Sequence, residues 1–239
     1  MFNFLKSKNP KVTFFTQVEG LKESAPIKPS INFIPNWFRQ VPPNADMLTG
    51  TIKKCPGFID FMKRGFVVPL WCDLYVKLEK TENGLYYEWK TPDPDFNFEI
   101  HQQEQFLNHV PQNAKDTYHM ILKTDCPWKV LTTEGYSLLQ LPMTYDYSEY
   151  FDVLPGIIHS DVYHTINQQM CMKKLGEYII KKGTPLAMYV PFKREEYDMA
   201  MEIENEFLRA KRINQMRCIK SKFSNRFSEY KKLIDFKGD

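Results

Sequence analysis

Cysteines are few and scattered in this chain. There are five among 239 residues, and no two stand in a Cys-x-x-Cys spacing. A disulfide framework needs pairs and a structural zinc site needs closely spaced ligands, so an odd, scattered set is typical of reduced thiols in a cytoplasm. The sequence therefore predicts neither disulfides nor a zinc centre.

Glycine and long apolar runs are also scarce. Ten residues are glycine and 16 are proline, which argues against a low-complexity or fibrous chain. Mean hydropathy is -0.47, and no apolar run approaches the roughly 18 residues of a membrane span. The first ten residues have no apolar stretch long enough for a signal peptide. We expect a protein that does not cross a membrane.

Several catalytic signatures are missing. The sequence has no P-loop, no Gly-x-Gly-x-x-Gly and no Gly-x-Ser-x-Gly, which removes the phosphate cradles and the nucleophile elbow that these motifs build. Only five histidines are present. Any metal or acid–base chemistry must therefore use a small set of candidates.

What the chain does have is a regular succession of short strand and turn signals. In residues 150–195, Pro155-Gly156 and Lys182-Gly183-Thr184-Pro185 are turns between β-branched and aromatic runs, and Lys174-Leu175-Gly176 is expected to close a hairpin. Similar signals upstream bring the total to ten to twelve strands. We predict a mainly β domain over residues 1–193, of the sandwich, jelly-roll or β-clip kind.

The C-terminal segment, residues 194–239, has a different pattern. Residues 194–236 contain no proline or glycine, and their apolar residues recur at steps of three or four, which predicts one long helix. The apolar positions are Met199, Ile203, Phe207, Ala210, Ile213, Met216, Ile219, Phe223, Phe227, Tyr230 and Ile234.

This segment is also the basic part of the chain. Residues 209–239 hold ten Lys or Arg and three Asp or Glu, whereas the formal charge of the whole chain is +3. One interpretation is that the apolar stripe packs on the protein's own sheet. The other is that the helix binds a protein partner or a second copy, with nucleic acid as a further acidic partner. The residues expected to make such contacts are Arg212, Arg217, Lys220, Phe223, Phe227 and Tyr230.

His159-Ser160-Asp161 is the main candidate for chemistry. On a strand, residues two apart point to one face, so His159 and Asp161 could supply two ligands of a two-His-one-carboxylate Fe(II) site. This pattern resembles the oxygenases that use 2-oxoglutarate, but no histidine follows His164 to complete their order. The other interpretation is an exposed polar turn after Pro155-Gly156, with no cofactor.

The same stretch resembles the dUTPase and dCTP deaminase β-fold. Residues 155–161 match its Pro-Gly-x-x-Asp-x-Asp turn and strand, and residues 183–187 lie where its next hairpin stands. His159 replaces the family's water-activating aspartate, and the family's phosphate motif is missing. The resemblance implies a related β-architecture, or a nucleotide-binding β-clip protein without hydrolase activity.

Four phrases in order resemble an uncharacterised protein family of tailed marine phages, of the T4-like cyanophage type. They are TIKKCPGFIDFMKRGFVVPLWCD, GYSLLQLPM, VLPGIIHSDVYHTINQQ and KKGTPLAMYVPFKRE. The resemblance implies a phage source and brings no activity. We therefore expect a non-enzymatic binding or structural protein that acts in the cytoplasm of the infected host or in the virion.

Overall fold

A computed structural model describes residues 10–47, 49–93 and 96–221, with residues 217–221 described by their backbone alone. The chain divides into two compact units. The first comprises the residues up to Gln40 together with Met62–Arg194, and it contains all the named strands. The second comprises Val41–Phe61 and the residues from Glu195 onward.

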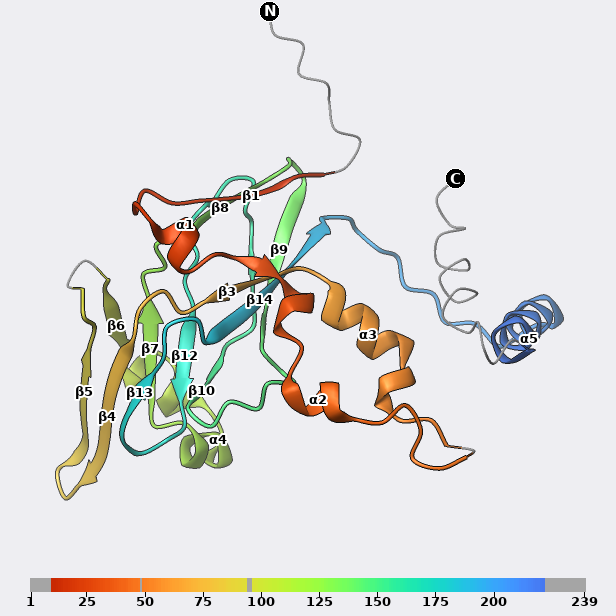
Figure 1. Cartoon of the computed structure of the whole chain (residues 1–239). Coiled ribbons are helices and arrows are strands. Elements are labelled where there is room, and N and C mark those ends of the chain that lie inside the picture. The colour runs from red at the N-terminus through yellow and green to blue at the C-terminus, as the bar shows by residue number, and fades with distance from the viewer. Residues whose placement is uncertain (1–9, 48, 94–95, 222–239) are drawn as a thin grey trace, which may run out of the picture. The chain divides into compact units, whose positions relative to one another are not determined.

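The described residues form fourteen strands, and every pair is antiparallel. This confirms the prediction of a mainly β fold. The two largest sheets have the strand orders β11-β9-β14-β3-β2 and β10-β12-β7-β6 (Figure 1). Their strands are β2 (Lys28–Pro29), β3 (Phe66–Pro69), β6 (Phe98–His101), β7 (Met120–Thr124), β9 (Tyr136–Pro142), β10 (Phe151–Val153), β11 (Gly156–Ile158), β12 (Gln169–Met172) and β14 (Pro185–Lys193).

Two smaller sheets complete the unit. One has the order β13-β4-β5, from β4 (Leu74–Thr81), β5 (Gly84–Lys90) and β13 (Gly176–Ile180), and the other pairs β1 (Val12–Phe15) with β8 (Lys129–Thr132). The Asn-Gly signal predicted the turn between β4 and β5, and Thr81 does pair with Gly84. Gly84 has φ +117°, a conformation that glycine adopts without a steric penalty.

One apolar cluster connects the sheets of this unit. The cluster includes Leu138 and Tyr189 of the five-stranded sheet with the nearby Trp71, Val76 of β4 and Leu122 of β7, and each is at most 1% exposed. Buried residues alternate with more exposed ones along β4, because every second side chain points inward and packs against the neighbouring sheets. Burial of this cluster is the main stabilising contribution to the unit.

Short helices and 3-10 turns connect the strands. The apolar spacing of residues 56–63 predicts a short helix, which is confirmed as α3; it ends before Gly65, whose φ of +74° suits the residue after a helix. The apolar residues at 31–34 predict a short strand, which is wrong, because a 3-10 turn lies there. The elements are α1 (Leu21–Ser24), η1 (Ser30–Phe33), α2 (Asn36–Gln40), η2 (Ile52–Lys54), α3 (Pro56–Lys63), η3 (Gln103–Gln105), η4 (Leu107–His109), α4 (Gln112–Thr117) and α5 (Glu206–Ser221).

The hairpin predicted around Lys174-Leu175-Gly176 is wrong. β12 pairs with β10 and β7, whereas β13 pairs with β4, so the turn carries the chain from one sheet to another. Met170, Cys171 and Met172 are all fully buried. β12 pairs with β10 on one edge and with β7 on the other, so it has no free edge for β13.

The long helix predicted over residues 194–236 is also corrected. Residues 195–205 are not helical, and α5 begins at Glu206. The side chain of Asn205 accepts a hydrogen bond from the Leu208 N–H (2.9 Å), which is the contact of a helix N-cap. Asp198 and Glu202 would stand four residues apart on a helix, where like charges repel. The predicted residues beyond Ser221 lie outside the described residues.

No helix in the described part of the chain is long and apolar enough to span a membrane.

Candidate functional site

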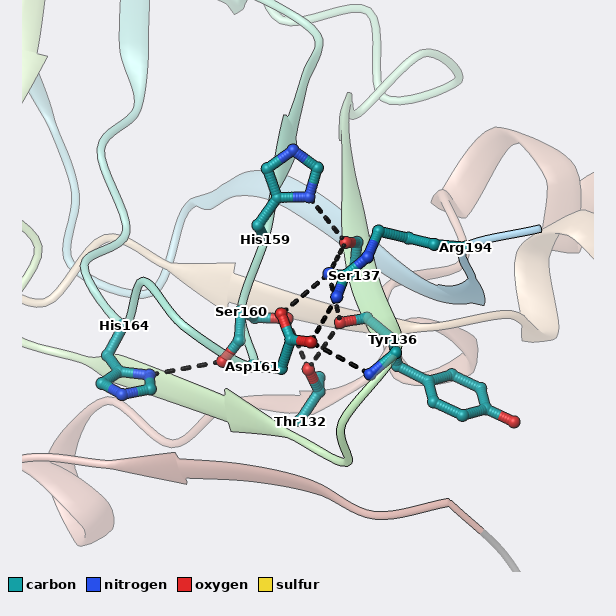
Figure 2. Close-up of polar contacts among 9 residues, drawn as sticks. Thr132, Tyr136, Ser137, His159, Ser160, Asp161, His164 and Arg194 are labelled. Carbon is teal, nitrogen blue, oxygen red and sulfur yellow. Dashed lines mark hydrogen bonds and ion pairs between the residues drawn. The ribbon is translucent and has the colours of Figure 1, made fainter. Parts of the chain in front are cut away.

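The strand predicted to carry His159 and Asp161 ends before both of them. β11 stops at Ile158, and the backbone N–H groups of Val162 and Tyr163 donate to the His159 carbonyl, which closes a turn. The two side chains therefore do not share a strand face. Figure 2 shows them pointing to different partners, His159 toward Ser137 and Asp161 toward Arg194.

Asp161 is held in a two-point ion pair. Arg194 Nη1 donates to Asp161 Oδ1 (2.7 Å), and Arg194 Nη2 donates to Oδ2. The backbone N–H of Gly135 also donates to Oδ2 (3.0 Å). The Asp161 side chain is only 5% exposed, whereas that of Arg194 is 35% exposed. A bidentate arginine–carboxylate pair of this kind combines charge attraction with a fixed geometry.

The position of these groups follows from the sheet order β11-β9-β14. Asp161 comes just after β11, Gly135 just before β9, and Arg194 just after β14. The Arg194 N–H also donates to the Gly135 carbonyl (2.8 Å). One carboxylate thus links three neighbouring strands at the end where β11 and β14 finish and β9 begins. We call Gly135, Asp161 and Arg194 the strand-end clamp.

The clamp changes the acidity of its carboxyl group. Hydrogen bonds from Arg194 hold the pKa of Asp161 well below its usual range, with a further contribution from the Gly135 N–H. The same contact raises the pKa of Arg194. Asp161 is therefore a carboxylate at neutral pH, and it is a poor candidate for a general acid.

His159 has a separate partner. Its Nδ1 lies 3.0 Å from Ser137 Oγ, which also accepts a hydrogen bond from Arg194 Nη1 (2.9 Å). A serine beside an imidazole is the beginning of a nucleophilic pair, but Ser137 is completely buried. A buried hydroxyl cannot reach a substrate, so this contact orients the imidazole.

The remaining polar groups of the turn satisfy one another. Ser160 Oγ is 2.8 Å from Thr132 Oγ1, which donates to the Tyr136 carbonyl (3.0 Å). His164 Nδ1 lies 3.0 Å from the Val130 carbonyl and 3.3 Å from the Ser160 carbonyl, the second of which Figure 2 shows. A carbonyl can only accept, so this nitrogen carries the proton. These contacts hold the turn against β8.

A cavity of about 310 Å³ is lined in part by His159. Its other walls include β11 and the loop that follows the turn, and its lining is mixed polar and apolar. The lining residues are Gln140, Gly156, Ile157, Ile158, His159, Tyr163, Thr165, Asn167 and Gln169. It is large enough for a small molecule.

The arrangement offers little to a metal ion. Among the described residues, no three His, Cys, Asp or Glu side chains gather closely enough to hold one. An Fe(II) ion at His159 and Asp161 would require Asp161 to leave Arg194 and a third ligand to be supplied.

The predicted partner-binding residues fall mostly at the end of the described chain. Arg212 lies on α5 and pairs with Glu204, with Nε 2.6 Å from Oε1 and Nη2 3.1 Å from Oε2. Arg217 and Lys220 lie on α5, and their side chains are not described. Phe223, Phe227 and Tyr230 lie outside the described residues.

Sequence reasoning missed Ser137 and Arg194. Both occupy strand-end positions that are far from His159 and Asp161 along the chain and close only through the sheet order. The one local signal was an arginine directly after a buried strand, a common arrangement with many uses.

Comparison with known proteins does not assign this chain to a family, since no family model and no curated sequence matches it.

Proposed function

We propose that the chain is a phage-encoded, non-enzymatic binding or structural protein that engages a protein partner through its C-terminal segment. The phage source depends on the four phrases that resemble the tailed-phage family. The site of action proposed is the cytoplasm of the infected host or the virion. The fold proposed for the β unit is a sandwich of the jelly-roll or β-clip kind, supported by separate antiparallel sheets around one core.

The observation that carries the function is the segment from Tyr197 to Ile203. Tyr197, Met199, Met201 and Ile203 alternate with Asp198, Ala200 and Glu202, and these four apolar side chains are 81–94% exposed. The segment has no regular secondary structure, and it belongs to no sheet of the described residues. Alternation of this kind is typical of a strand with one face buried, and a peptide buries such a face by joining the edge of another sheet.

The geometry around Asp161 supports the non-enzymatic part of the proposal. A carboxylate held by Arg194 and Gly135 at the ends of three strands has a structural role that needs no substrate. The hydroxyl beside His159 is buried.

The proposal is tested by changing one face of the exposed segment. In the variant Met199→Asn/Met201→Asn we expect an unchanged unfolding temperature, within the roughly 0.5 kcal/mol typical of surface changes. We also expect the loss of an association that the wild-type chain shows, with itself in sedimentation velocity or with phage particles in co-sedimentation. The matched control is Ala200→Asn/Glu202→Gln, which changes the other face.

Two outcomes would contradict the proposal. Equal association of wild type and both variants would show that the apolar face makes no intermolecular contact. A large drop in the unfolding temperature of the methionine variant would show that this face packs on the chain's own fold.

A second candidate function is nucleotide binding without hydrolysis. It is favoured by the cavity of about 310 Å³, since that cavity borders Gly156 and Ile157 of the stretch that resembles the dUTPase-like fold. Tyr163 and Asn167 line it too, and Asn167 Nδ2 donates to the Tyr163 hydroxyl (3.3 Å). An aromatic ring and amide groups in one cavity suit a nucleobase.

This candidate predicts that dUTP or dCTP raises the unfolding temperature. A ligand at 100 times its dissociation constant adds about 2.7 kcal/mol to the free energy of unfolding. Asn167→Ala should abolish the shift, and Asn113→Ala, a substitution on α4 outside this cavity, should keep it. No shift with either nucleotide, or equal shifts in both variants, would exclude the candidate.

The Fe(II) oxygenase hypothesis remains a prediction with less support. It needs the Asp161 carboxylate, which Arg194 occupies, and a third ligand, which no described residue places beside His159.

A further inference from the structure

A second hollow lies far from His159 along the chain, where the β4–β5 hairpin faces η4 and α4. Its volume is about 340 Å³. Lys80, Thr81, Gly84 and Leu85 line it from the hairpin, and Leu107 and Lys115 are among the residues opposite. In Figure 1, β4, β5 and β6 run along one side of the first unit. The remaining lining residues are Gln103, Asn108, Tyr118 and His119.

The charge of this hollow is unbalanced. Its lining includes two lysines and no carboxylate. In the described part of the chain, neither Lys80 nor Lys115 has a carboxylate within ion-pair distance, whereas Lys77 pairs with Glu79 (3.3 Å) and Lys90 with Glu88 (2.7 Å). Lysines elsewhere on these sheets are neutralised, and the two at the hollow are not.

Two carboxylates that neighbour lining residues are engaged with other groups. Asp116, next to Lys115, accepts a hydrogen bond from Gln112 (2.9 Å). Asp152 accepts from the Tyr118 hydroxyl (3.0 Å) and pairs with Lys173 (3.0 Å). Neither residue lines the hollow, so the positive charge there is available to a ligand.

Hydrogen-bond donors accompany the two charges. Lys115 uses one of its three donors on the Asn108 carbonyl (3.0 Å), which fixes the ammonium at the hollow and leaves two donors. Burial, and then the charge of Lys80, lower the pKa of His119. Its ring is therefore neutral at pH 7 and does not repel the two ammonium groups. The amides of Gln103 and Asn108 add further polar groups.

A smaller hollow with a mixed polar and apolar lining adjoins the first. Its volume is about 200 Å³, and it shares Leu85, Gln103 and His119 with the larger one. Its lining also includes the carboxylate of Glu104. Tyr87 and Ile100 add apolar surface to it from the edge strands β5 and β6. A ligand that fills both hollows has an anionic end and an apolar or planar body.

We propose that these adjoining hollows form a binding site for a small organic phosphate. The phosphate lies between Lys80 and Lys115, and the organic group lies against Leu85, Tyr87 and Ile100. A phosphate dianion balances two ammonium groups and accepts several hydrogen bonds, which one carboxylate does less well. This site is independent of the exposed C-terminal segment and of the cavity at His159.

The probe is phenyl phosphate, with inorganic phosphate and uncharged benzyl alcohol as controls for its anionic and its aromatic part. We expect phenyl phosphate to bind the full-length chain with a dissociation constant of about 1 mM or below, and each control to bind more weakly. In two-dimensional NMR, the amide signals of Leu85, Gln103 and His119 should move, and those of Ile157 and Tyr163 should not.

The variants separate this site from general surface charge. Lys80→Gln and Lys115→Gln should each raise the dissociation constant about tenfold, because each removes a charge-assisted contact with the phosphate. Lys77→Gln removes the same charge from the same strand on the opposite face, and it should leave binding unchanged.

The proposal is overturned if phenyl phosphate does not bind at about 10 mM. It is overturned too if Lys77→Gln weakens the binding of phenyl phosphate as much as Lys80→Gln and Lys115→Gln do. A third contrary result would be amide signals that move at the His159 cavity and not at the hollow. Benzyl alcohol binding as tightly as phenyl phosphate would equally exclude phosphate recognition.

Discussion

Replacing Gly65 by alanine is expected to lower the free energy of unfolding by about 3 kcal/mol or more. Gly65 has φ +74°, where a non-glycine residue costs roughly 1–2 kcal/mol. An added Cβ would also lie 2.2 Å from the carbonyl oxygen and 2.9 Å from the carbonyl carbon of Tyr189, and those atoms are backbone of β14. Neither strand can yield easily, because β3 and β14 pair at Phe66 and Tyr189.

The measurement is a thermal or urea unfolding curve of the Gly65→Ala variant. In a domain of this size, about 1 kcal/mol shifts the unfolding temperature by roughly 2–4 °C. Gly20→Ala is the matched control, since Gly20 has φ +72° and nothing within 4 Å of an added Cβ. Equal losses in the two variants would show that the contact with Tyr189 contributes nothing.

Asp161→Asn is expected to destabilise the protein at neutral pH and much less in acid. The native pKa of Asp161 is lowered by Arg194, so the pair stabilises the fold above the unfolded value of about 3.9. That contribution is lost as the pH falls below 4 toward the native pKa. The asparagine keeps the shape of the side chain, but it cannot pair with Arg194 as a charge.

Unfolding curves at pH 7 and near pH 3 test this. We expect the difference in free energy of unfolding between wild type and variant to be smaller at the acidic pH. Asp73→Asn is the control, since Asp73 pairs with Lys181 (2.8 Å) in a contact whose side chains are 41% and 69% exposed. Solvent screens that exposed pair, so its loss should have a smaller effect. If the difference in free energy of unfolding between wild type and Asp161→Asn did not change with pH, the charge of Asp161 would contribute nothing to stability.

Much of the local structure was predictable. Helix α3, the Asn83-Gly84 turn and strands such as β7 and β9 depend on signals within a few residues, namely periodicity, turn residues and β-branched runs. The prediction was wrong where two local patterns competed. Residues 197–203 fit both a helical step of four, from Met199 to Ile203, and a period of two, and in the structure they form neither a helix nor a strand.

The candidate site was only half predictable. His159 and Asp161 stand in a motif that sequence reasoning can find, but its interpretation depends on Ser137 and Arg194. No spacing along the chain links these residues. They meet because β9 lies between β11 and β14, an order that local patterns do not contain.

The sequence by itself determined that the chain is mainly β and where many of its turns lie, because these properties depend on residue types and short spacings. Only the tertiary structure decided that β12 and β13 belong to different sheets, that Asp161 faces Arg194 and that Lys80 and Lys115 line one hollow. Strand pairing depends on which apolar faces bury one another across the whole unit, and that is a non-local property of the chain.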